Sequence, residues 1–213
     1  SSSVDFSVIA TDINGCIGHD TVEVAVMDVD AGMDVEICLN ASTQLNATVS
    51  DGLMPYTYSW SPAASLSNDT IANPVASPTV TTTYTVVVTD AFGTTYSDTV
   101  VVTVNPLPSV AVSDIDNCIG SSGMLNAVVT GGTAPYAYSW TPTTDLSDPS
   151  IANPVASPSV MTTYTVVVTD AKGCTATDDA VVNLHSLPTV DAGADAIITS
   201  GANHPLMAVG SGG

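Results

Sequence analysis

The chain has 213 residues, of which 21 are acidic and only one, Lys172, is basic, so its formal net charge is −20. Such a charge repels nucleic acid phosphates and anionic membrane surfaces, and no apolar run approaches the roughly 20 residues of a membrane-spanning helix. Only 10% of the residues are charged and 45% are apolar, which favours a packed core over disorder. We therefore expect no nucleic acid partner and no direct membrane insertion.

The sequence repeats itself at an interval of 80 residues. The letters IANPVASP occupy residues 71–78 and return at 151–158. The letters TTYTVVVTDA occupy residues 82–91 and return at 162–171. Repetition at a fixed interval is typical of tandem domains, and a unit of this size can bury one modest core.

The two flanks are pieces of the same unit, because residues 6–26 match 84–104 and residues 191–213 match 30–52. We predict four segments: the C-terminal part of one repeat at 1–28, complete repeats at 29–107 and 108–188, and the N-terminal part of a further repeat at 189–213. The end pieces together lack a counterpart of residues 53–78. We therefore interpret the chain as part of a longer protein.

All predicted elements are strands. Thr, Val, Ser and Tyr dominate, Pro and Gly recur about every 8–12 residues, and apolar residues alternate with polar ones. In the first complete repeat the strands are expected at 45–49, 56–60, 84–89 and 97–104. This length and spacing predict an all-β fold of tandem immunoglobulin-like β-sandwich repeats of about 80 residues.

Alternate residues of a strand share one face, and this pattern distinguishes core positions from an exposed binding surface. Tyr56, Tyr58 and Trp60 share one face of their predicted strand and recur 80 residues later. A platform for stacking sugars is the alternative, but the shared parity favours burial. In the strand at 84–89 the side chains expected to point inward are Tyr84, Val86 and Val88.

A turn motif, Asp-x-x-Gly, follows the same strand in every repeat and occurs at 12–15, 90–93 and 170–173. The Asp side chain can accept hydrogen bonds from the turn backbone, and Gly tolerates a positive φ angle. The motif therefore predicts a tight hairpin.

The letters PYxYSW, IANPVASP, TTYTVVVTDAxGC, NPLP and DAGxD together cover essentially the whole chain. They resemble the PKD-like repeats, and the related SprB-type repeats, of very large surface proteins from gliding bacteria. The resemblance implies an immunoglobulin-like sandwich, export across the outer membrane to the extracellular cell surface, and roles in adhesion, gliding or surface fibres. It implies no catalysis. Thr94 departs from the motif, which has Cys at that position.

Four cysteines in an exported chain predict disulfide bonds. Cys118 and Cys174 lie in the same repeat, and a bridge between them is the first expectation. It would leave Cys38 unpaired, because its hairpin counterpart is Thr94. In the alternative, Cys38 pairs with Cys174 of the next repeat, while Cys16 and Cys118 pair with neighbours outside this chain. A third interpretation leaves Cys38 as a free buried thiol.

Acidic residues gather at the predicted junctions between repeats. The candidates for a metal site are Asp28, Asp30, Asp34, Asp114, Asp116, Asp191 and Asp195. Calcium prefers oxygen ligands and is the one candidate cofactor, although no stretch carries a calcium loop with its terminal Glu. Solvated acids are the alternative. At the junction 105–108, Asn-Pro-Leu-Pro has two fixed φ angles, which predicts a semi-rigid joint.

Asp-Thr-aliphatic triplets surround Thr21, Thr70 and Thr99 and resemble the O-glycosylation sequon of the same bacterial group. Chance is the alternative, because Asp and Thr are abundant. No zinc-ligand spacing, GxSxG motif or phosphate loop is present, so we predict no catalytic residue and no enzyme activity.

The sequence therefore favours a structural segment of a long extracellular stalk, adhesin shaft or surface filament. Its partners would be neighbouring repeats or identical chains in a fibre. The alternatives are a module that binds surface glycans and an accessory region of a secreted hydrolase.

Overall fold

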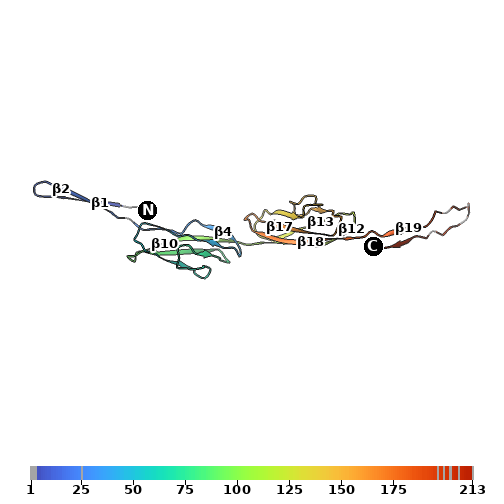
Figure 1. The fold of residues 1–213 in the computed structure, drawn as a ribbon, viewed down its shortest axis with the longest axis horizontal. Helices are drawn as coiled ribbons and strands as arrows, with labels where there is room; N and C mark the ends of the chain where they lie inside the picture. Colours follow the sequence, from blue (N-terminus) through green and yellow to red (C-terminus); the bar gives the residue numbers. More distant parts are fainter. Residues whose placement is uncertain are drawn as a thin grey trace. The chain divides into compact units, whose positions relative to one another are not determined.

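The computed structural model describes these residues: 4–24, 26–195, 197–198, 200–201, 203–205 and 207–212 (Figure 1). All regular secondary structure in this part of the chain is β-strand, as the alternating pattern predicts. Among the described residues no helix is long and apolar enough to cross a membrane. The chain divides into two compact units, Ser1–Asn105 and Pro106–Gly213. The finer division into four segments stays a prediction.

The first unit contains ten strands among its described residues. In chain order they are β1 (Val4–Thr11), β2 (Ile17–Val24), β3 (Asp28–Asp30), β4 (Val35–Cys38), β5 (Thr43–Gln44), β6 (Thr48–Ser50), β7 (Thr57–Ser61), β8 (Val75–Ala76), β9 (Thr82–Thr89) and β10 (Thr95–Asn105).

The described part of the second unit repeats the order of β3 to β10 and adds a short C-terminal pair. Its strands are β11 (Pro108–Ala111), β12 (Ile115–Cys118), β13 (Gly123–Met124), β14 (Val128–Gly131), β15 (Ala137–Thr141), β16 (Val155–Ala156), β17 (Thr162–Thr169), β18 (Thr175–His185), β19 (Thr189–Asp191) and β20 (Val209–Ser211).

Each unit contains one four-stranded sheet that faces short strand pairs. In the first unit the sheet order is β4-β10-β9-β7, and the pairs are β3–β6 and β5–β8. In the second unit the order is β12-β18-β17-β15, with the pairs β11–β14 and β13–β16. In both sheets the first strand runs parallel to the long strand beside it, and the other pairings are antiparallel.

The core lies between these layers, and the predicted inward faces are confirmed. Tyr84, Val86 and Val88 of β9 are each 0% exposed, and Trp60 of β7 is 2% exposed. Tyr56 and Tyr58 are partly buried and pack against the same cluster. The second unit buries the equivalent side chains, which include Trp140, Tyr164, Val166 and Val168. The burial of Trp60 and the packing of Tyr56 and Tyr58 against the core favour the core interpretation over a sugar-stacking platform.

The recurring IANPVASP segment has a structural explanation. The indole Nε1 of Trp60 donates a hydrogen bond to the carbonyl of Ile71 at 2.9 Å, and Trp140 donates to Ile151 at the same distance. Ala76, near the end of the first copy, is 0% exposed. The segment therefore covers the buried indole and accepts the hydrogen bond of its N–H group, which a buried Trp requires.

The predicted strand at 45–49 is interrupted in the structure. β5 ends at Gln44 and β6 begins at Thr48, and between them the amides of Leu45 and Ala47 donate to carbonyls of the IANPVASP segment at 2.9 Å. Leu45 and Ala47 stay buried. The alternating pattern was therefore correct for the side chains, but it does not reveal a backbone that changes its hydrogen-bonding partner.

The hairpin of β1 and β2 matches β9 and β10 in sequence and pairs along its whole length, from Val4↔Val24 to Thr11↔Ile17. Phe6 is 56% exposed in this hairpin, whereas its equivalent Tyr84 is fully buried. Backbone pairing in this segment therefore forms in the structure without a covering layer.

Adjacent valines on β9 offer a matched test of this core. We expect Val86→Ala to lower the free energy of unfolding by about 2 kcal/mol, because it removes two buried methyl groups and leaves a cavity. Val87→Ala makes the same chemical change on the outward face, where Val87 is 37% exposed, and should cost about 0.5 kcal/mol or less. Urea denaturation followed by circular dichroism measures both values. Equal losses would contradict the assigned face.

Candidate functional site

The hairpins at the Asp-x-x-Gly motifs are the most regular polar features of the molecule. In the second unit Oδ1 of Asp170 accepts hydrogen bonds from the amides of Lys172 and Cys174, both at 2.9 Å. Oδ2 accepts a further bond from the amide of Thr133 at 2.9 Å. Gly173 has a φ angle of 80°, as the motif predicts.

Asp90 makes the same contacts in the first unit. Its Oδ1 accepts from the amides of Phe92 and Thr94 at 2.9 Å, and its Oδ2 from the amide of Leu53 at 3.4 Å. Asp12 holds its own turn in this way, through the amides of Asn14 and Cys16. The carboxylate therefore closes the hairpin in all three copies, and in the two sandwiches it also ties the hairpin to the loop before β7 or β15.

These contacts change the acidity of two carboxyl groups. Burial raises the pKa of Asp90, but the hydrogen bonds from the amides of Thr94, Leu53, Phe92 and Gly93 outweigh it, so the pKa lies below its ordinary value. The pKa of Asp170 is lowered in the same way: burial raises it, and four donating backbone amides more than offset that effect. Both groups are therefore charged structural acceptors.

The predicted junction acids mostly hold backbone as well. Oδ1 of Asp34 accepts from the amide of Val101 at 2.8 Å, and Oδ1 of Asp114 accepts from Val181 at 2.8 Å. Asp30 and Asp191 each accept from the amide of the glycine two residues later, at 2.8 Å. The bonds of Asp34 and Asp114 fasten the segment after β3 or β11 to the long strand, whereas those of Asp30 and Asp191 stabilise local turns.

The remaining candidates are distributed rather than gathered. Asp116 lies 3.1 Å from Nε2 of His185, and both side chains are mostly exposed. Asp28 belongs to β3, where its backbone pairs with Ser50. Within the described residues, no three His, Cys, Asp or Glu side chains form a group that could hold a metal ion. Calcium binding stays a hypothesis.

Asp98 and Asp178 are structural acids that the sequence analysis missed. Oδ2 of Asp98 accepts from the amide of Ala31 at 2.8 Å, and Oδ2 of Asp178 accepts from Val112 at 2.7 Å. They are equivalent residues of β10 and β18. Their recurrence at an interval of 80 residues, on strands otherwise rich in Val and Thr, is the signal that would have identified them.

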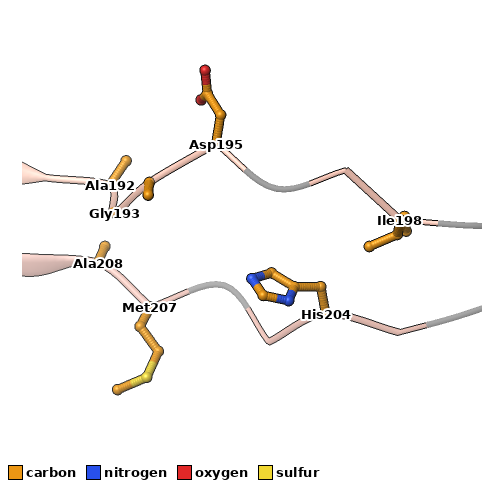
Figure 2. A pocket seen from close by; sticks show the side chains of 8 residues that line it. Ala192, Gly193, Asp195, Ile198, His204, Met207 and Ala208 are labelled. Atoms are coloured by element: carbon orange, nitrogen blue, oxygen red, sulfur yellow. The ribbon is translucent and has the colours of Figure 1, made fainter.

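A concave surface near the C-terminus contains the last candidate acid. Its lining residues are Ala192, Gly193, Ala194, Asp195, Ile198, His204, Met207 and Ala208. Figure 2 shows the imidazole of His204 pointing between two facing segments, while the carboxylate of Asp195 points away from them. His204 and Asp195 therefore do not form an acid–base pair here.

The four cysteines fall into two states. Cys38 and Cys174 are disulfide-bonded, whereas Cys16 and Cys118 are free and exposed. The first expectation, a bridge between Cys118 and Cys174, is therefore wrong. The physical reason lies within the second unit: Cys118 pairs with His185 at the end of β18, while Cys174 directly precedes its start.

The length of β18 makes that bridge impossible. The strand has 11 residues, which at about 3.3 Å per residue places its ends roughly 33 Å apart. A disulfide requires Cα atoms within about 7 Å. The states of the cysteines support the alternative pairing of Cys38 with Cys174, and they rule out a free Cys38.

The three glycosylation candidates are exposed. Thr21 lies in β2, Thr99 in β10, and Thr70 in a turn, where its hydroxyl donates to Oδ1 of Asn68 at 2.8 Å. Each side chain is accessible to a transferase, and modification stays a prediction.

The comparisons with known proteins agree with this architecture. The family model of the SprB repeat matches residues 111–145, in the second unit. The N-terminal eight Ig domains of Down Syndrome Cell Adhesion Molecule are similar over 88% of this chain and 28% of that one, with 14% identity and a TM-score of 0.57. The titin I-band fragment I67-I69 is similar over 78% and 68%, with 16% identity and a TM-score of 0.41.

Identities this low show the fold alone: the chain is an all-β segment of immunoglobulin-like sandwiches. The search of curated proteins found no match. The SprB repeat match and the repeated sandwich together indicate an immunoglobulin-like repeat segment.

The hairpin carboxylates predict an acid-sensitive fold. A carboxyl group whose folded pKa is lowered stabilises the protein above its unfolded pKa of about 3.9, and this stabilisation is lost as the pH falls further. We expect the free energy of unfolding to be flat above about pH 5 and to fall below about pH 4. Urea denaturation of the native chain and of Asp170→Asn at pH 7 and pH 3 measures this, and the variant should be less stable at pH 7 with a smaller loss on acidification. Asp179→Asn removes the same charge from an exposed position of β18 and should leave the stability at pH 7 near native.

The junction acids predict indifference to calcium. Because carboxylate oxygens of Asp30, Asp34 and Asp114 already accept backbone amides, we expect the same melting temperature in millimolar calcium and in excess chelator. A specific site at 100-fold excess of calcium over its dissociation constant would instead add about 2.7 kcal/mol. Differential scanning calorimetry distinguishes the two results.

Proposed function

We propose that this chain is a structural repeat segment of a long extracellular stalk, adhesin shaft or surface filament. The observation that carries the proposal is the position of the two chain ends of each sandwich, together with the SprB repeat match at residues 111–145.

The chain enters the second sandwich at Pro108, the first residue of β11, which pairs with Gly131. A Cβ atom added to the next residue, Gly132, would lie 2.9 Å from the carboxylate of Asp170 and 3.0 Å from Pro108. The point of entrance therefore lies beside the hairpin that precedes β18. We call this end of a sandwich its N-terminal pole.

The chain leaves the same sandwich at His185, the last residue of β18. We call this end the C-terminal pole. The two poles are about 33 Å apart, which is the length of an 11-residue strand. The first sandwich has the same arrangement, with its own 11-residue strand ending at Asn105. Entrance and exit at opposite poles suit sandwiches that are connected in series.

Strand pairing inside each sandwich suits tension along such a series. β12 runs parallel to the end of β18, with Ile115 opposite Val182 and Cys118 opposite His185. A pull on both chain ends draws these two strands in opposite directions, so their hydrogen bonds bear the load together rather than one after another. β4 and β10 repeat the arrangement.

The polar groups inside the sandwiches favour a durable material. Among the described residues, no buried side-chain nitrogen or oxygen lacks a hydrogen-bond partner. The acids near the poles stabilise turns and segment ends, as Asp170 and Asp114 do. Because acidic side chains accept backbone hydrogen bonds in both sandwiches, their placement supports a scaffold rather than a reactive centre.

Immunogold electron microscopy of the producing cells tests the proposal. Antibodies raised against the purified chain should label extended structures on the cell surface, and fractionation should recover the antigen with that material. Label confined to the medium, in a fraction with hydrolase activity, would favour an accessory region of a secreted hydrolase. Binding of the purified chain to particular sugars on a glycan array would favour the glycan-binding alternative.

A further inference from the structure

The four cysteines occupy only two kinds of position. Cys38 and Cys118 are equivalent: each ends the strand that runs parallel to the long strand, and each pairs with its last residue, Asn105 or His185. Both therefore lie at the C-terminal pole of their sandwich. The amide of Leu39, next to Cys38, donates to the carbonyl of Asn105 at 2.8 Å, which confirms that position.

Cys174 and Cys16 form the second kind. Each follows the glycine of an Asp-x-x-Gly hairpin and donates its amide to Oδ1 of the hairpin Asp, at 2.9 Å for Cys174 and 2.8 Å for Cys16. In the second sandwich this hairpin also binds Thr133, whose amide donates to Oδ2 of Asp170 and whose carbonyl accepts from the amide of Ala171. Cys174 therefore lies at the N-terminal pole, where the chain enters.

The linker between these two kinds of position is short. From Asn105, at the C-terminal pole of the first sandwich, to Pro108, at the N-terminal pole of the second, there are three residue steps. Three steps span at most about 11 Å. This linker is short enough to let a cysteine at the end of one sandwich bond with a cysteine at the start of the next.

We propose that a cysteine at the C-terminal pole and a cysteine at the N-terminal pole of the following repeat form a joint disulfide. Cys38 and Cys174 are one such pair, and Cys118 and Cys16 are the two halves of further joint disulfides with other repeats of this kind. The proposal deepens the proposed function, on which it rests, because it names the group that connects successive repeats covalently.

The states of the cysteines support this assignment. The two cysteines whose partner position belongs to a neighbouring sandwich of this chain, Cys38 and Cys174, are bonded, and their equivalents Cys118 and Cys16 are free and exposed. In the first sandwich the equivalent of Cys174 at the N-terminal pole is Thr94. The joint that precedes this sandwich therefore cannot form such a disulfide. A joint is therefore bridged only where both positions carry cysteine.

The chemistry requires an oxidant with a disulfide of its own. The thiolate of one cysteine attacks that disulfide and releases one thiol, and the thiolate of the second cysteine then displaces the other. The two protein thiols lose two protons and two electrons in total, and the oxidant is reduced to two thiols. Oxidised glutathione supplies this reaction in the test below.

The native chain allows a direct test of the disulfide, because Lys172 is its only Lys or Arg residue and trypsin therefore has a single cleavage site. The chain is oxidised with glutathione, its free thiols are alkylated, and it is unfolded in urea and cleaved. We expect the fragments 1–172 and 173–213 to stay together on a non-reducing denaturing gel and to separate after reduction. Cys38→Ser should separate them without reduction, whereas Cys118→Ser should not. The opposite result would overturn the proposal.

A longer chain tests whether Cys118 forms a disulfide with the following repeat. Residues 133–188 are copied and joined after Gly213, which completes a third repeat with a second copy of Cys174. After the same treatment, we expect Cys118 to hold the short C-terminal tryptic fragment, and Cys118→Ser to release it. A matched control changes the copied Cys174 to Thr, as at Thr94, and should also release the fragment.

Folding of the added repeat is measured independently. The copied Trp140 should emit as a buried indole, as expected for Trp140 itself, which is 1% exposed. Release of the fragment from a folded third repeat would overturn the assignment of Cys118. If the third repeat does not fold, the native-chain assay with Cys38→Ser and Cys118→Ser still decides the proposal. Neither assay depends on where the protein acts in the cell, so failure of the joint disulfide and failure of the filament function are distinguishable.

Discussion

Burial of one face of β9 and β17 is the interaction on which the rest of each sandwich depends. Tyr84, Val86 and Val88 lose all their exposed surface, and the neighbouring strands contribute Trp60 and Val102 to the same cluster. Each large apolar side chain buried in this way contributes about 1.5–3 kcal/mol. The β1–β2 hairpin has the same sequence pattern and register, but its Phe6 is mostly exposed. Strand pairing is thus set locally, and the covering layer creates the core.

Closing that core leaves polar backbone at the ends of the strands, and acidic side chains satisfy much of it. Asp90 and Asp170 each hold amides of their own hairpin and of a second loop. Asp34 and Asp114 each accept one backbone amide of a long strand. A carboxylate can accept several bonds at once, so a short acidic residue can organise two segments that are distant in sequence. Part of the strong negative charge therefore has a structural use.

The sequence could predict whatever depends on a local period. The inward set of β9, the hairpin at each Asp-x-x-Gly motif and the all-β class follow from alternation and turn chemistry, because each involves residues a few positions apart. The break between β5 and β6 could not be predicted in this way. It depends on carbonyls of the IANPVASP segment, far along the chain, which take the amides of Leu45 and Ala47.

The same distinction explains the candidate site. The presence of two cysteines in one repeat favoured a bridge between Cys118 and Cys174. In the folded repeat these residues lie at opposite poles of the sandwich, so they cannot bond. The junction acids looked alike in sequence, yet Asp34 and Asp114 bind backbone of a strand some 67 residues later. Asp98 and Asp178 escaped notice because their partners, Ala31 and Val112, are equally distant.

The charge of the chain gives a covalent joint a physical purpose. Repeats that all carry negative charge repel one another, and salt screens this repulsion only beyond about 8 Å at physiological ionic strength. A non-covalent contact between such repeats would therefore weaken at low salt, and only one basic residue, Lys172, is available to offset the acids. A disulfide does not depend on ionic strength, and the two prolines of the linker limit its conformations. The proposed joint disulfide would therefore keep neighbouring repeats connected at any salt concentration, despite the repulsion between their acids.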